Sequence, residues 1–161
     1  MIKTFEQFIS EACVSPCKVA WEKVDGVDFQ KNKSYVLKKK NKYTEYRYSV
    51  VTIPSFGLDV PFSEDSDQTY ADFINKFEFA VNVEAYNDCW CKGTDGLKQF
   101  KYYLIRYPFS DMENRLDPGR VKQFGGWKYE VKMCASAQSG FEVDNRGEMI
   151  GMNIIEWVEL D

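Results

Sequence analysis

Apolar and polar residues alternate along most of the chain beyond residue 34, and this period of two is typical of β-strands. Pro, Gly and short polar runs interrupt the alternation, which predicts separate strands joined by turns. Both faces of the segment 99–107 are apolar, so we expect it to lie inside a sheet with a neighbour on each side. The expected strands cover residues 35–37, 43–53, 79–86, 99–107 and 127–134, followed by a terminal hairpin of residues 141–143 and 148–158.

A period of three to four residues replaces the alternation in two places and predicts helices there. The first is an amphipathic N-terminal helix, in which Thr4 and Gln7 have the spacing of a capping box and Pro16 ends the pattern. The second helix begins at Thr69 and has one apolar face, formed by Tyr70, Phe73, Ile74 and Phe77. In addition, a single helical turn is expected near residues 112–116.

The chain shows no internal repeat and no linker rich in Pro, Gly and Ser. Its 161 residues are in the size range of one domain and are enough to bury a substantial core. We therefore expect an α+β fold with two parts. Residues 1–16 form the amphipathic helix, and residues 17–161 form a single globular domain with a mainly antiparallel sheet of six to seven strands and two to three helices.

The sequence contains no histidine, and this restricts the chemistry open to the chain. Histidine is the commonest general base and a common zinc ligand, so Ser-His-Asp and Cys-His catalysis are excluded. The cysteine pairs Cys13/Cys17 and Cys89/Cys91 lack the C-x-x-C spacing of structural zinc sites. We expect no metal and no cofactor, and a non-enzymatic role is favoured over an enzymatic one.

The compartment is predicted from the cysteines and from the apolar runs. Five cysteines without a secretory signal indicate reduced thiols in a cytosol-like compartment; the fifth is Cys134. No apolar run approaches the roughly 18–20 residues that cross a bilayer. We expect a soluble intracellular protein with no membrane partner.

Charge is unevenly distributed, although the net charge is only −4. The stretch from Lys31 to Arg47 carries seven basic residues and one acid, whereas the stretch from Asp59 to Asp72 is acidic. Solvated faces are the favoured interpretation. The alternative is a module for single-stranded nucleic acid, with tyrosines stacking beside a basic hairpin, and the overall acidity argues against it. The candidate basic patch consists of Lys38, Lys39, Lys40 and Lys42.

Two groups of carboxylates are the candidates for an enzymatic alternative. Asp111, Glu113 and Asp117 follow Pro108, and a second group extends from Glu142 to Glu148. Paired acids can perform general acid–base work or hold a divalent cation. Neither group has the spacing of a known motif, so no catalytic residue is assigned.

The first twelve residues carry a motif that the rest of the chain does not. Lys3, Thr4 and Phe5 precede the segment Phe8-Ile9-Ser10-Glu11-Ala12. This stretch resembles the capsid-targeting sequence of internal head proteins in T-even-like bacteriophages, with Ile2 as one inserted residue. In that family a short helix directs the protein into the assembling prohead, and the prohead protease cuts after the glutamate.

The resemblance implies a role that composition alone does not. Glu11–Ala12 would be the cut bond, and Phe8, Ile9 and Ser10 would be the recognition residues before it. The implied protein is virion-associated or packaged in the head, is present in the host cytoplasm and the virion, and binds a phage head or scaffold protein. A host protein, such as a defence enzyme that it inhibits, is the implied second partner. The docking face of the helix would consist of Ile2, Phe5, Phe8 and Ile9.

Overall fold

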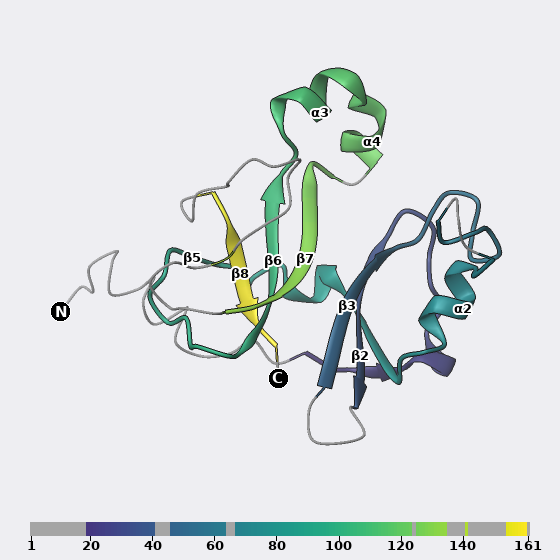
Figure 1. Ribbon diagram of the computed structural model, residues 1–161, viewed down its shortest axis with the longest axis horizontal. Helices are drawn as coiled ribbons and strands as arrows, with labels where there is room; N and C mark the ends of the chain where they lie inside the picture. Colours follow the sequence, from purple (N-terminus) through teal and green to yellow (C-terminus); the bar gives the residue numbers. More distant parts are fainter. Residues whose placement is uncertain are drawn as a thin grey trace. The chain divides into compact units, whose positions relative to one another are not determined.

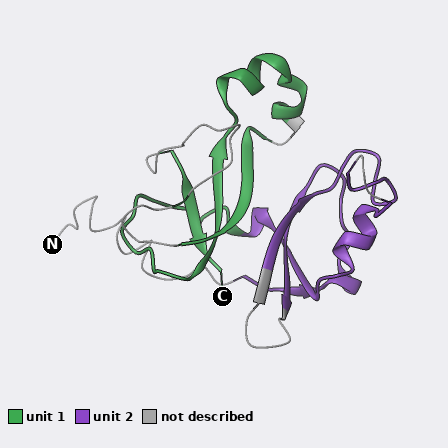
Figure 2. Cartoon of the chain, in the orientation of Figure 1, with its two compact units in different colours: residues 1–18, 86–161 green, residues 19–85 purple. Residues whose placement is uncertain are grey.

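The computed structural model describes residues 19–40, 46–63, 67–123, 125–134, 141 and 154–160 (Figure 1). The N-terminal helix expected over residues 1–16, with its targeting and docking residues, lies outside this part of the chain. The chain divides into two compact units (Figure 2). Unit 2 is Val19–Ala85, and unit 1 combines Met1–Lys18 with Tyr86–Asp161.

Unit 2 contains a four-stranded antiparallel sheet in the order β1-β4-β2-β3. The alternating segments on either side of Asn41 form the expected hairpin, in which Ser34 pairs with Thr52 and Lys40 with Tyr46. The elements are β1 (Glu22–Lys23), the 3-10 helix η1 (Val24–Gly26), β2 (Ser34–Lys40), β3 (Tyr46–Thr52), α2 (Tyr70–Ile74) and β4 (Phe79–Asn82), followed by the 3-10 helix η2 (Val83–Tyr86).

Helix α2 begins directly after Thr69, as the sequence predicts, and Thr69 forms a capping box with Asp72. Thr69 Oγ1 accepts a hydrogen bond from the Asp72 N–H at 3.2 Å, and the Asp72 carboxylate accepts one from the Thr69 N–H at 3.0 Å. The Thr69 hydrogen bonds hold the pKa of Asp72 below its ordinary value. The helix ends at Ile74, one turn earlier than its apolar pattern. Ile74 packs into the unit 2 core with Tyr35, Leu37, Val51, Ile53, Ala80 and Val24.

Unit 1 contains a second four-stranded antiparallel sheet, in the order β5-β8-β6-β7. Its strands are β5 (Cys91–Lys92), β6 (Tyr102–Pro108), β7 (Trp127–Met133) and β8 (Glu156–Glu159). Helices α3 (Asp111–Leu116) and α4 (Pro118–Gln123) connect β6 to β7 (Figure 1). Strand β6 pairs with both β7 and β8, so the prediction of an inner strand is confirmed.

The core of unit 1 includes two aromatic residues whose polar atoms are hydrogen-bonded, Tyr103 and Trp157. The buried Tyr103 ring contacts Phe141 and Trp157 edge-on, at centroid distances of 5.5 and 5.3 Å. Its hydroxyl accepts the Lys98 N–H at 2.7 Å, and Trp157 Nε1 donates to the Gly93 carbonyl at 2.8 Å. Because burying an aromatic residue removes its polar tip from water, these two bonds compensate for lost hydration.

The α+β class and the antiparallel pairing are confirmed, but the predicted single sheet of six to seven strands is wrong. The described residues form eight strands in two sheets, with three α-helices. Residues 83–86 are a 3-10 helix instead of the second half of a strand, and α4 was not expected. In the predicted terminal hairpin, only residues 141 and 154–158 are described, and the strand there pairs with β5 and β6.

The cysteines also differ from the expectation of reduced thiols throughout. Cys89 is part of a disulfide, whereas Cys91 and Cys134 are free and buried. Both free cysteines belong to the hydrophobic core of unit 1. In that position they act as small apolar side chains.

Candidate functional site

The predicted basic patch is described at two of its four lysines. Lys38 on β2 is only 9% exposed, and its Nζ lies 4.4 Å from the centroid of the Trp21 ring. Lys39 Nζ lies 5.9 Å from the centroid of the Phe77 ring. Cation–π contacts therefore hold both lysines against the aromatic surface of unit 2. A lysine as buried as Lys38 offers little of its charge to a phosphate backbone, and the side chains of Lys40 and Lys42 lie outside the described residues.

The acids that follow Pro108 begin the two helices of unit 1. Glu113 forms a capping box with Ser110, and its buried carboxylate also accepts from Lys128 Nζ at 2.8 Å, which ties α3 to β7. Burial raises the pKa of Glu113, but the hydrogen bonds from Lys128 and Ser110 outweigh it and bring the pKa below its ordinary value. Asp117 Oδ1 accepts the Arg120 N–H at 3.2 Å at the start of α4. Glu113 and Asp117 thus have structural roles, and Glu142 to Glu148 lie outside the described residues.

A charged cluster in unit 1 was not foreseen from the sequence. The Arg106 guanidinium lies 4.3 Å from the ring centroid of Trp90 and 4.3 Å from that of Trp127. Glu156 Oε1 accepts from Arg106 Nε at 3.1 Å and from Nη2 at 2.7 Å. The Arg106 and Glu156 side chains are 16% and 11% exposed. A planar guanidinium suits both stacking on rings and hydrogen bonding to a carboxylate, so this cluster joins β6 to β8.

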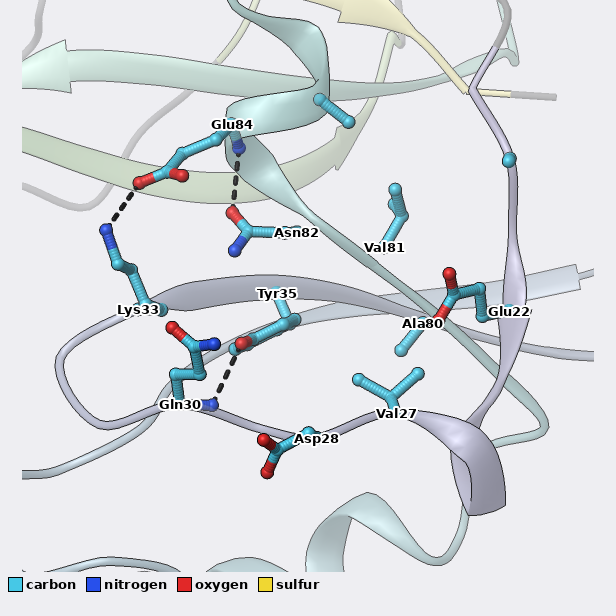
Figure 3. A pocket seen from close by; sticks show the side chains of 12 residues that line it. Glu22, Val27, Asp28, Gln30, Lys33, Tyr35, Ala80, Val81, Asn82 and Glu84 are labelled. Carbon is cyan, nitrogen blue, oxygen red and sulfur yellow. Dashed lines mark hydrogen bonds and ion pairs between the residues drawn. The ribbon is translucent and has the colours of Figure 1, made fainter.

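The candidate site for a ligand is a pocket of about 540 Å³ in unit 2 (Figure 3), which we call the unit 2 pocket. Its apolar lining comes mainly from Val27, Ala80, Val81 and Tyr35. Tyr35 is held in place because its hydroxyl accepts the Gln30 N–H at 2.9 Å and its ring packs edge-on against Phe29 at 4.7 Å. The segment 27–30 is thereby fixed beside the sheet as one wall of the pocket.

Most of the charged residues that line the unit 2 pocket are acidic. The lining contains three carboxylates, from Glu22, Asp28 and Glu84, and one ammonium group, from Lys33. Lys33 Nζ donates to Glu84 Oε1 at 2.7 Å, and this bond raises the pKa of Lys33. Asn82 Oδ1 accepts the Glu84 N–H at 2.9 Å, which fixes the backbone of Glu84 (Figure 3).

Glu22 and Asp28 differ from Glu84 because neither makes an ion pair or a side-chain hydrogen bond within the described part of the chain. Glu22 lies on β1 directly opposite Ala80 of β4, so it stands at the edge of the apolar surface. The described lining holds no Ser, Thr, Cys or His. The charged and apolar groups that are present can bind a ligand through ion pairs, hydrogen bonds and apolar contacts.

Sequence reasoning missed the unit 2 pocket because its residues come from segments far apart in the chain. Glu22 and Glu84 are brought together only by the pairing of β1 with β4 and by the turn into η2. No spacing or motif marks them. The alternating pattern placed Tyr35 and residues 80–82 in strands, but it did not indicate that these strands share a pocket.

Within ranges 19–40, 46–63, 67–123, 125–134 and 154–160, no three Asp, Glu or Cys residues are grouped so as to hold a metal ion. In the same ranges no helix is both long and apolar enough to traverse a bilayer. Comparison of the chain with protein-family models, with curated proteins and with solved structures gives no match.

Proposed function

We propose that this chain is a bacteriophage protein that is carried in the phage head and acts by binding. The observation that supports this most strongly is the segment Phe8-Ile9-Ser10-Glu11-Ala12 near the N-terminus. It resembles a prohead-protease site within a capsid-targeting helix. The apolar stripe that contains Phe5 and Phe8 docks on a head or scaffold protein during assembly, because so short a helix needs a partner surface to be stable.

Cleavage after Glu11 then separates this helix from the body of the protein. The body, from Ala12 onward, is the part that acts after delivery into the host. Its two compact units, each with its own hydrophobic core, suit a protein that must remain folded through packaging and release. The resemblance implies that its target is a host protein, and a defence enzyme that it inhibits is the proposed target.

A binding role agrees with the chemistry of the described charged groups. Arg106 is paired with Glu156, and Glu113 is paired with Lys128, in buried or nearly buried contacts that stabilise unit 1. The lining of the unit 2 pocket combines carboxylates with apolar side chains. These features favour recognition over bond-making.

Packaging of three variants tests the proposal. Removing residues 2–11 should abolish incorporation into particles, whereas Glu11→Gln should allow incorporation and block cleavage. Glu6→Gln is the matched control, because it removes a carboxylate from the same segment without touching the cut bond. Immunoblots of purified particles give the readout. Incorporation of the shortened chain at the normal level would contradict the docking role.

A further inference from the structure

The outer strands of the two described sheets differ in how their edges are protected. β1 and β5 have only two residues each, and β7 carries Lys128, Glu130 and Lys132. Short length and charged side chains, lysine above all, prevent an edge strand from pairing with another chain. β3 has seven residues, with one charge and neither Pro nor Gly. Among the described outer strands, β3 is therefore the one that lacks this protection.

The hydrogen bonds beside β2 show which backbone groups of β3 point outward. The Ile53 N–H donates to the Lys33 carbonyl at 2.9 Å, so the backbone of Ile53 faces the β2 side. These groups alternate in direction along an antiparallel strand, so Val51 also faces β2, whereas Val50 and Thr52 face away from it. Both outward-facing residues are half-buried, and β3 pairs with β2 and with no other strand of the described residues. Their N–H and C=O groups are therefore directed at the open edge of the sheet.

The order of residues along β3 suits antiparallel pairing with the same strand of a second copy. When Ser49 of each copy lies on a twofold axis, Val50 of one copy falls opposite Tyr48 of the other, and all seven residues are paired. The smallest side chain of the strand is then at the closest approach, and aromatic residues fall opposite β-branched ones, which is a favourable cross-strand combination. Arg47 falls opposite Val51, so the single charge of the strand meets no like charge.

We propose that two copies of this chain associate through β3, so that the sheet of unit 2 continues into the second copy. A contact of one seven-residue strand is smaller than the roughly 1,200–2,000 Å² that a stable interface buries. The dimer is therefore reversible, and its population depends on the protein concentration. This inference goes beyond the proposed function, because it does not depend on a phage origin and concerns the purified protein.

Hydrogen exchange of the backbone amides, resolved by NMR on the full chain at a low and a high concentration, tests the proposal without a substitution. The Val51 amide faces β2 and should exchange slowly in both samples. The amides of Val50 and Thr52 should exchange about tenfold more slowly once about nine-tenths of the chains are dimeric, because exchange then occurs from the remaining monomer. Slow exchange of Val50 in both samples would show that another part of the chain covers the edge. That result, or fast exchange in both samples, would overturn the proposal.

Val50→Pro removes an outward N–H that the dimer needs. Proline is tolerated on an edge strand where its missing N–H would face outward, so unit 2 should remain folded. The bond occurs twice in a twofold dimer, and its loss should weaken self-association in sedimentation equilibrium by about thirtyfold. Val51→Pro is the matched comparison: it removes an N–H that bonds to β2 and should destabilise unit 2 instead. Undiminished association of Val50→Pro, or equal stability of the two variants, would contradict the assignment.

Cross-linking through Ser49→Cys gives a result that does not depend on a proline. Opposite Cβ atoms in an antiparallel pair are about 4.5–5.5 Å apart, and a disulfide forms there after a small adjustment. With oxidised glutathione as the oxidant, the two introduced thiols should join two chains, and the oxidant leaves as two molecules of reduced glutathione. Ser55→Cys is the matched control, because Ser55 is an exposed residue of unit 2 outside β3. Equal cross-linking of the two variants, or no linked dimer of Ser49→Cys above the parent, would overturn the proposal.

Discussion

Replacing Glu156 by Gln tests whether the charged cluster of unit 1 contributes to stability. Glu156 Oε1 accepts two hydrogen bonds from Arg106, at 3.1 and 2.7 Å, and the two side chains are 16% and 11% exposed. Gln keeps the shape and one acceptor oxygen but removes the charge. Arg106 would remain between Trp90 and Trp127 without a counter-ion.

The expected decrease in the free energy of unfolding follows from the two hydrogen bonds. A hydrogen bond to a charged group contributes about 1.5–3 kcal/mol, and a neutral one about 0.5–1.5 kcal/mol. Each of the two bonds therefore loses about 1 kcal/mol, and we expect a total near 2 kcal/mol. For a chain of this length that corresponds to a fall in Tm of about 4–8 °C.

A double-mutant cycle separates the pair from its surroundings. Arg106→Met alone leaves the buried Glu156 carboxylate without a positive partner. It should lower the free energy of unfolding by about 3–5 kcal/mol, the range for breaking a buried ion pair. The double variant Arg106→Met/Glu156→Gln removes both charges and should be less destabilised than Arg106→Met alone, because no unpaired charge remains. The sign of this difference is the feature specific to a paired site.

Urea unfolding followed by tryptophan fluorescence is the assay, because the cluster carries its own reporters. Trp90, Trp127 and Trp157 belong to unit 1, and Trp21 belongs to unit 2. A Trp21→Phe background confines the signal to unit 1. The reasoning is refuted if Glu156→Gln stays within about 0.5 kcal/mol of the parent, the usual range for surface substitutions, or if the double variant loses the sum of the two single losses.

Two further predictions concern unit 1. The pKa of Glu113 is lowered below its ordinary value of 4.5, so its stabilising contribution is complete above pH 4.5 and is lost as the pH falls through the pKa of the folded state. Glu113→Gln should therefore lower the free energy of unfolding at pH 7 and make that free energy depend less on pH in the acidic range. An unchanged pH dependence in the acidic range would contradict this. Phe100 has a φ of +66° and is 66% exposed, so Phe100→Gly should be more stable than Phe100→Ala by about 1 kcal/mol; equal Tm values for the two variants would show that the backbone there is unstrained.

The elements that the sequence predicted correctly are those with strong local signals. The apolar face that includes Tyr70 and Phe73 predicts a helix beginning at Thr69, and in the structure Thr69 is the residue that caps α2. The residues from Tyr102 to Pro108 are apolar on both faces, and they form an inner strand. The start of the helix depends on contacts between residues close together in the sequence. The inner position of the strand is visible in the sequence because its side chains are apolar on both faces.

The division into two sheets could not be predicted, because it depends on pairings that leave no pattern. β1 and β5 are two residues each, too short to show a period, yet each supplies an edge strand. Arg106 and Glu156 meet only because β6 pairs with β8. The unit 2 pocket depends in the same way on the pairing of Glu22 with Ala80.

The proposed function has its most direct test in the N-terminal residue of the protein inside mature particles. If the chain is the phage protein proposed above, peptide mass spectrometry of purified virions should find a chain beginning at Ala12, together with the loss of the peptide that contains Phe8. Detection of a chain in the particles that still begins at Met1, or absence of the protein from particles, would contradict the claim that the opening segment is a removable targeting helix.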